Sequence, residues 1–283
     1  MTVQAADAPL TIIRAGRRGV GTDLRELWEF RELLLFIVWR NVKIRYKQTA
    51  LGASWAVLQP LLLMVVFTIF LGKLGGISSK LPHGLPYPVF AFSALVPWTL
   101  FAQGVGQAAD SLVGNSNLVS KIYFPRLILP LASIASFLVD FTIALAVLAV
   151  IMAAYGTPLP GPRVLLIVPL TLLALATAAG VGIGLAALNV RFRDVRYAVP
   201  FLLQLWLFAS PIAYPASQVP SAWRVAYGLN PMAGVVEGFR WALLGLTWSP
   251  GPMIGVSIAV TCALLVGSLV YFGRTERTFA DIV

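Results

Sequence analysis

Residues 127–155 read LILPLASIASFLVDFTIALAVLAVIMAAY, a stretch in which Asp140 is the only charged side chain. A helix rises 1.5 Å per residue, so about 20 apolar residues are needed to cross the hydrocarbon core of a bilayer, which is about 30 Å thick. The stretch is longer than this requirement and almost wholly apolar. It therefore predicts a membrane-spanning helix.

The composition of the whole chain leads to the same conclusion. Of its 283 residues, 59% are hydrophobic and 11% are charged, whereas an ordinary soluble domain has about 45–50% apolar and about 25% charged residues. Five further windows are also long and apolar enough to cross a bilayer. We therefore predict an all-α polytopic membrane protein with six transmembrane helices, in residues 54–71, 89–109, 127–155, 164–188, 198–214 and 252–272.

The distribution of basic residues predicts the orientation. If both termini are cytoplasmic, sixteen of the 21 Lys and Arg residues lie on the cytoplasmic side of the predicted spans, and such an excess is typical of cytoplasmic loops. Nine of them precede position 48, where they face anionic lipids, so the net charge of +10 does not indicate a nucleic-acid partner. The five basic residues outside are Lys73, Lys80, Arg163, Arg224 and Arg240.

Several kinds of chemistry are excluded by the residue types and motifs that the sequence lacks. A lone Cys262 and a lone His83 supply neither a disulfide framework nor a metal site. The sequence contains no phosphate-binding Walker motif, zinc-protease motif or serine-hydrolase motif. Without such motifs the chain has no visible means of hydrolysing ATP, so any energy for uphill transport must come from a partner.

Residues 1–21 have no apolar core, so we expect a flexible cytoplasmic leader rather than a signal peptide.

Residues 23–47 are predicted to form an amphipathic helix. Acidic residues cluster in its first turns, which favours a helix N-terminus, and apolar residues recur at helical spacing. A helix of this kind lies in the plane of the membrane interface, with Trp28 and Trp39 as anchors. Two interpretations stay open, since the helix either only orients the first span or also docks to a partner.

The first cytoplasmic loop, residues 110–126, is unusually apolar for a segment that faces water. An apolar helix exposed at the membrane face is suited to docking into a groove on another protein. The alternative is that the loop folds back on the bilayer. The apolar residues in question are Leu118, Val119, Ile122, Tyr123 and Phe124.

Two further polar features lie within apolar sequence. Asp140 either forms a structural hydrogen bond between helices or takes part in gating, because intramembrane carboxylates are costly and often functional; with no base at membrane depth beside it, a proton pump is unconvincing. Residues 231–246 resemble a seventh span but contain Glu237 and Arg240, each costing about 2.5–3.5 kcal/mol at a helix centre. We therefore expect residues 215–246 to form outward re-entrant helices.

Four stretches resemble the type-2 ABC transporter permeases of the polysaccharide-export class. They are RNVKIRYKQTALGASWAVLQPLL (40–62), NLVSKIYFPRLILPLASIASFLVDF (117–141), LNVRFRDVRYAVPFLLQLW (188–206) and LNPMAGVVEGFRWALLG (229–245). The resemblance implies one transmembrane domain over residues 22–283, in the bacterial cytoplasmic (inner) membrane. It implies export of a lipid-linked glycan such as O-antigen, capsule or teichoic acid. It also implies a second copy of the chain and two ATP-binding subunits, which use ATP and Mg²⁺ while this chain binds no cofactor.

The resemblance also implies roles for particular segments. The interface helix falls on residues 23–47, the coupling helix on 111–126 and the outward gate helices on about 215–246. Glu237 and Arg240, one helical turn apart, are expected to pair and hold that gate shut. The coupling residues are then expected to be Asn117, Leu118, Lys121, Ile122, Tyr123, Phe124 and Arg126, the apolar ones inserted into a groove on the ATP-binding partner.

Aromatic residues within the spans suggest a route for the substrate. Aromatic faces offer apolar area with few fixed hydrogen bonds, so that sugar rings can slide along them, and the resemblance places the first and fifth spans around the conduit. The alternative is that these aromatics pack helices or face lipid. The candidates for lining the conduit are Trp55, Phe67, Trp206, Phe208 and Tyr214.

Three other functions were compared with glycan export. An ABC exporter of a drug or a small lipid would share the same fold. A secondary transporter would need membrane-depth charges or internal repeats, and the sequence has one intramembrane acid and no clear repeat. A membrane-embedded glycosyl- or phosphotransferase would need acidic or histidine clusters at the interface, which the sequence lacks.

Overall fold

The computed structural model describes residues 26–47, 54–82, 84–158, 160–246, 249–276 and 279. Every regular element within these ranges is a helix, so the all-α prediction is confirmed for this part of the chain. The predicted leader, residues 1–21, and the start of the predicted interface helix, residues 23–25, lie outside the described residues.

Five helical segments are long and apolar enough to cross a membrane, and they correspond to five of the six predicted spans. Three of them are composite: one continues into a π-helical turn, one begins with a 3₁₀ turn, and one is interrupted by a short break. The segments are α3 (Ser54–Phe67) with η1 (Thr68–Leu74), α4 (Tyr87–Asp110), α6 (Ile128–Ala135) with α7 (Leu138–Ala154), η4 (Pro162–Leu166) with α8 (Ile167–Arg191), and α12 (Gly251–Thr275).

The sixth predicted span, residues 198–214, is only partly helical. The helix there, α9 (Val195–Ala209), is about 22 Å long at 1.5 Å per residue, which is shorter than the hydrocarbon core. Ser210 is already extended (ψ 151°), and Pro211 follows it. Because proline disfavours helical backbone at the residue before it, the helix ends here and residues 210–214 form a non-helical return. The count of six spans therefore stays a prediction.

The first span also differs from its expected end at residue 71. The helix continues to Leu74 as a π-helical turn, after which the Gly75 N–H donates to the Phe70 carbonyl over 2.8 Å. A Cβ on Gly72 would lie 2.9 Å from the ring of Tyr87, at the start of α4. Gly72 therefore allows close packing of two helices rather than ending one of them.

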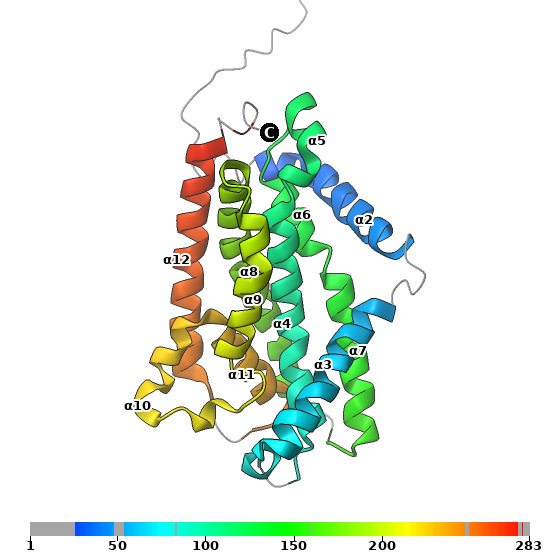
Figure 1. Cartoon of the computed structure of the whole chain (residues 1–283), viewed down its shortest axis with the longest axis vertical. Coiled ribbons are helices and arrows are strands. Elements are labelled where there is room, and N and C mark those ends of the chain that lie inside the picture. Colours follow the sequence, from blue (N-terminus) through cyan, green and yellow to red (C-terminus); the bar gives the residue numbers. More distant parts are fainter. Residues whose placement is uncertain are drawn as a thin grey trace, which may run out of the picture.

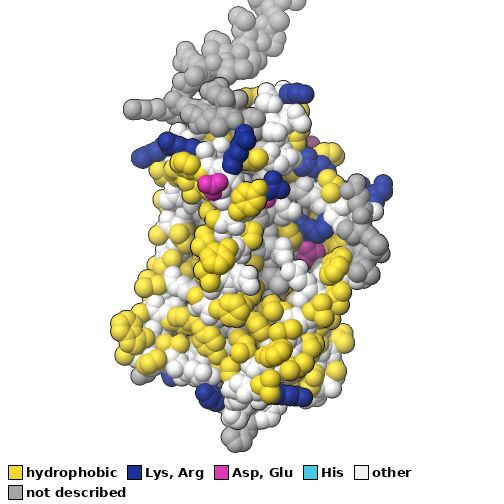
Figure 2. All heavy atoms as spheres, in the orientation of Figure 1, with side chains coloured by type: hydrophobic (Ala, Val, Ile, Leu, Met, Phe, Trp, Pro, Cys, Tyr) yellow, Lys and Arg dark blue, Asp and Glu magenta, His cyan; other side chains and the backbone are white. Residues whose placement is uncertain are grey.

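The connections alternate between the two ends of the bundle (Figure 1). At the upper end lie the oblique helix α2, α5, the turn between α8 and α9, and the end of α12, and Lys and Arg side chains gather there (Figure 2). Which side of the membrane this end faces stays a prediction. The remaining elements are α2 (Arg31–Lys47), η2 (Ile77–Lys80), η3 (Val113–Asn115), α5 (Ser116–Lys121), η5 (Ala216–Gln218), α10 (Ser221–Arg224), η6 (Ala226–Leu229) and α11 (Pro231–Leu244).

Helix α4 forms the centre of the bundle. It packs against α3, α6, α7, α8, α9 and α11, and most of its residues are buried. Of its 24 residues, only Gln103 and Gln107 are exposed. Helices α3 and α12, by contrast, have few fully buried residues, so one face of each is available to lipid or to another chain.

The orientation can be tested by labelling single cysteines in a chain whose Cys262 is replaced by Ser. A cysteine introduced next to Lys80 should react with a membrane-impermeant thiol reagent added outside, because η2 lies at the end opposite α2 and α5. A cysteine introduced next to Arg193 should react only after the membrane is permeabilised. The reverse pattern would contradict the topology.

Candidate functional site

The predicted docking loop contains the short helix α5 and an exposed apolar pair. Ile122 is 56% exposed and Tyr123 is 63% exposed, directly after the end of α5. Phe124 is only 7% exposed and belongs to the apolar core, because the chain turns inward at this point to begin α6. The prediction that Phe124 inserts into a partner is therefore wrong for this conformation. Leu118 is half-buried, and Asn117 and Lys121 are exposed.

Two basic side chains connect this loop to other elements. Arg40 of α2 donates a hydrogen bond of 2.8 Å to the side-chain oxygen of Asn115, whose amide nitrogen donates to the Ser111 carbonyl. Arg126, one of the expected coupling residues, donates to the backbone carbonyl of Glu276 at the end of α12. The loop is thus held between α2 and α12, and Arg126 has a bonding partner within its own chain.

Helix α2 has the exposed tryptophans expected of an interfacial helix. Trp28, which precedes it, is 71% exposed and Trp39 is 57% exposed, while Ile37 and Val42 are buried against the bundle. Lys43 lies 5.4 Å from the ring centre of Trp39. This combination of a buried apolar face and outward tryptophans is typical of a helix at the membrane surface.

Asp140 has partners that the sequence analysis did not identify. Residues 136–137 separate α6 from α7, so Asp140 lies in the first turn of α7 rather than in the middle of one continuous helix. Arg45 of α2 forms an ion pair with one oxygen of Asp140, and Tyr46 donates a hydrogen bond to the other. The carboxylate thus has a base beside it, and this supports the structural interpretation of Asp140.

Arg45 also holds the break between α6 and α7. Its guanidinium donates to Ser136 Oγ over 2.9 Å and lies 3.7 Å from the ring centre of Phe137. Burial raises the pKa of Tyr46 above its ordinary value, and the hydrogen bond to Asp140 raises it further, so the phenol stays a donor. These partners are about 90 residues apart in sequence, so no local motif could have predicted them.

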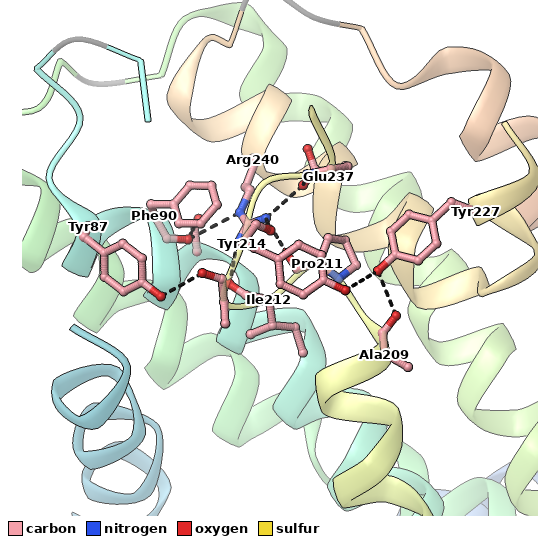
Figure 3. Close-up of polar contacts among 12 residues, drawn as sticks. Tyr87, Phe90, Ala209, Pro211, Ile212, Tyr214, Tyr227, Glu237 and Arg240 are labelled. Carbon is pink, nitrogen blue, oxygen red and sulfur yellow. Dashed lines mark hydrogen bonds and ion pairs between the residues drawn. The ribbon is translucent and has the colours of Figure 1, made fainter. Parts of the chain in front are cut away.

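Glu237 and Arg240 are paired and buried at the other end of the bundle (Figure 3). Arg240 Nη1 lies 2.8 Å from Glu237 Oε1, and neither side chain is more than 4% exposed. Arg240 also donates to the carbonyls of Pro211 and Ile212, and its guanidinium lies 3.5 Å from the ring centre of Phe90. The predicted pairing is therefore confirmed, whereas its role as a gate stays a prediction.

The same pair holds the non-helical return after α9. Besides pairing with Arg240, Glu237 Oε1 accepts a hydrogen bond of 3.2 Å from the Ala216 backbone N–H. Tyrosines hold the return from both sides, since Tyr87 Oη donates to the Ala213 carbonyl and Tyr227 Oη to the Ala209 carbonyl, each over 2.7 Å (Figure 3). Buried backbone carbonyls need such donors.

The five residues expected to line a conduit do not share one environment. Trp55 and Phe208 are 50% and 55% exposed, whereas Phe67 is 4% exposed, so its predicted place on a conduit wall is wrong for this conformation. Trp206 donates to the side-chain oxygen of Asn230 over 2.8 Å. Tyr214 Oη lies 2.8 Å from the hydroxyl of another tyrosine (Figure 3). These contacts support a packing role for both.

The chain is similar to a known family and to several individual proteins. Residues 32–244 match the family described as ABC-2 type transporter. The chain is 30% identical to the O-antigen export system permease protein RfbA of Myxococcus xanthus, over 92% of this chain and 98% of the relative. It is 28% identical to RfbA of Klebsiella pneumoniae over 89% and 95%. It is 25% identical to the polysialic acid transport protein KpsM of Escherichia coli over 84% and 91%.

Replacing Glu237 by Ala should destabilise the protein, because Arg240 would remain buried without its acidic partner. Removing one partner of a buried ion pair costs about 3–5 kcal/mol, and thermal unfolding of the detergent-solubilised protein measures the effect. Arg196→Ala is the control, since its pair with Asp110 spans 3.8 Å and is largely exposed, and such pairs contribute about 0–1 kcal/mol. Unchanged unfolding with increased transport would instead identify the pair as a gate.

Proposed function

The chain belongs to the ABC-2 type transporter family, and from this premise we propose that it is the membrane permease subunit of an ABC exporter of lipid-linked polysaccharide. The observation that carries the proposal is similarity over almost the whole length of an O-antigen export permease. A polysialic acid transport protein of the same size range is also similar. An O-antigen-like or capsule-like glycan is therefore the substrate class.

The proposal places ATP hydrolysis on separate partner subunits, which use ATP and Mg²⁺. The exposed Ile122 and Tyr123 supply an apolar contact at the upper end of the bundle, and the neighbouring Lys121 and Asn117 supply polar contacts around it. An exposed apolar patch bordered by polar residues suits a protein interface. Each ATP-binding subunit would dock here, in the cytoplasm, with both chain termini on the same side.

The proposal also includes a second copy of this chain in the bacterial inner membrane. Large apolar side chains are exposed along α3 and η1, at Leu62, Val65 and Phe70, and along α9, at Phe201 and Leu205. Lipid accounts for such exposure on one side of the protein. A conduit for a sugar chain, however, needs walls on all sides, and two copies facing each other through α3 and α9 would supply them.

Cells that lack this chain should lose their surface glycan and accumulate the lipid-linked precursor inside, because synthesis continues while export stops. Surface staining and extraction of the lipid-linked pool measure the two quantities, and the wild-type gene should restore both. Normal surface glycan in its absence would contradict the proposed function. Loss of drug resistance with normal surface glycan would indicate a drug exporter instead.

Replacing both Ile122 and Tyr123 by Ser should impair export in the same assay. Burying an apolar side chain contributes about 1.5–3 kcal/mol, so the ATP-binding subunit should bind on the order of tenfold more weakly or worse. The matched control is Leu165→Ser, because Leu165 is 73% exposed and lies in η4 at the opposite end. If the complex assembles and exports normally with both serines, this pair is not the coupling contact.

A further inference from the structure

A cavity of about 250 Å³, with polar side chains set among apolar ones such as Leu100 and Phe141, opens between α2, α3, α4 and α7. Its lining combines three glutamines, Gln59, Gln103 and Gln107, with the indole of Trp55. A second cavity of about 320 Å³ shares two lining residues with it, one of them Gln107. Both lie toward the upper end of the bundle, where α2 and α5 are found (Figure 1).

The exposed residues of α4 are the ones that line this cavity. Gln103 and Gln107 are the only exposed residues of α4, and they are one helical turn apart, so they present their amides on one face. A membrane helix that exposes a face to lipid carries apolar residues on it, because an amide in hydrocarbon loses its hydrogen bonds with water. Two exposed amides on an otherwise buried span therefore indicate a polar ligand or water at this face.

The opposite wall repeats the pattern on α3. Trp55 and Gln59 are also one turn apart, and the Trp55 side chain is half exposed. The amide nitrogen of Gln103 lies 3.4 Å from the amide oxygen of Gln59, a long hydrogen bond across the opening. Each glutamine amide has two donor hydrogens and an oxygen with two lone pairs. The pair therefore keeps hydrogen-bonding capacity for a ligand.

The charged groups at the α2 end of the cavity balance one another. Arg45 and Asp140 form an ion pair, and both oxygens of Asp140 are engaged, by Arg45 and by Tyr46. Among the described residues that line the cavity, no charge is left uncompensated to select an anion such as a phosphate. The other described lining groups are neutral: amides, the Thr99 hydroxyl, a phenol, an indole face and apolar side chains.

We propose that this cavity binds one or two sugar units of the glycan as it enters the transporter. Hydroxylated rings match the lining, because amides bond to neighbouring hydroxyls while an indole face covers the apolar C–H face of the ring. The inference rests on the proposed function and adds to it a recognition site for sugar on the cytoplasmic side. Arg45 and Asp140 act as positioning residues, since they hold α2 against the cavity.

The test uses the complex of this chain with its ATP-binding subunit in nanodiscs. Two probes are compared through their stimulation of ATP hydrolysis: a polyprenyl diphosphate carrying a disaccharide, and polyprenyl diphosphate without sugar. In the wild type the half-stimulating concentration should be lower for the probe with the disaccharide than for the sugar-free probe, and the ratio of the two concentrations is the sugar advantage. In the double variant Gln103→Leu, Gln107→Leu that advantage should shrink about tenfold, as expected for the loss of two net hydrogen bonds, while the response to the sugar-free probe is unchanged.

Controls separate recognition from folding. Thr142→Val removes an exposed hydroxyl from α7, outside both cavities and outside the proposed face between copies, and should behave as the wild type. Trp55→Leu should reduce the sugar advantage and Trp55→Phe should restore much of it. Equal weakening of both probes would show recognition of the diphosphate or lipid, and an unchanged advantage in the double variant would show that the glutamines only pack α3 on α4. Either result overturns the inference, whereas the proposed function is judged separately by surface glycan in cells.

Discussion

A buried guanidinium determines the arrangement of the end of the bundle opposite α2. Arg240 has no exposed surface, and it must satisfy its donors within the protein, since an unpaired charge at this depth is very costly. Glu237 supplies the negative charge, and the carbonyls of Pro211 and Ile212 accept the other hydrogen bonds. The chain after α9 therefore has to return past α11 instead of continuing as a helix. The non-helical return and its packing against α11 follow from this requirement, and Phe90 of α4 is held over the same guanidinium.

A comparable set of contacts joins the elements at the other end. Helix α2 bonds to the docking loop through Arg40 and to the break between α6 and α7 through Arg45. Through Arg45 and Tyr46 it also borders the cavity lined by Gln103 and Gln107. Helix α2 thus contacts the proposed docking loop, the spanning segment α6–α7 and the cavity, so under the proposed function it is the element suited to couple the ATP-binding subunit to the substrate path.

Much of this fold follows from apolar length and charge distribution. The five long spans, the short α11 and the pairing of Glu237 with Arg240 are local features, and the sequence predicts them correctly. The sequence places the end of α9 too late, because the apolar run continues to residue 214. The return of the chain after Ala209 depends on Arg240, which needs carbonyl acceptors, and this contact between distant residues is not visible in the local sequence. Phe67 and Phe124 were misassigned for the same reason, since the sequence shows that a residue is aromatic but not which way it faces. Arg45 and Asp140 come together only through packing of α2.

The central claim is that this chain moves a lipid-linked glycan with energy supplied by a separate ATP-binding subunit. The most direct measurement is translocation in proteoliposomes that contain both proteins and a lipid-linked glycan, detected by lectin access to the glycan in the opposite leaflet. We expect translocation to require ATP, Mg²⁺ and both proteins, and to stop when either protein is omitted. Translocation by this chain alone, driven by an ion gradient without ATP, would contradict the account.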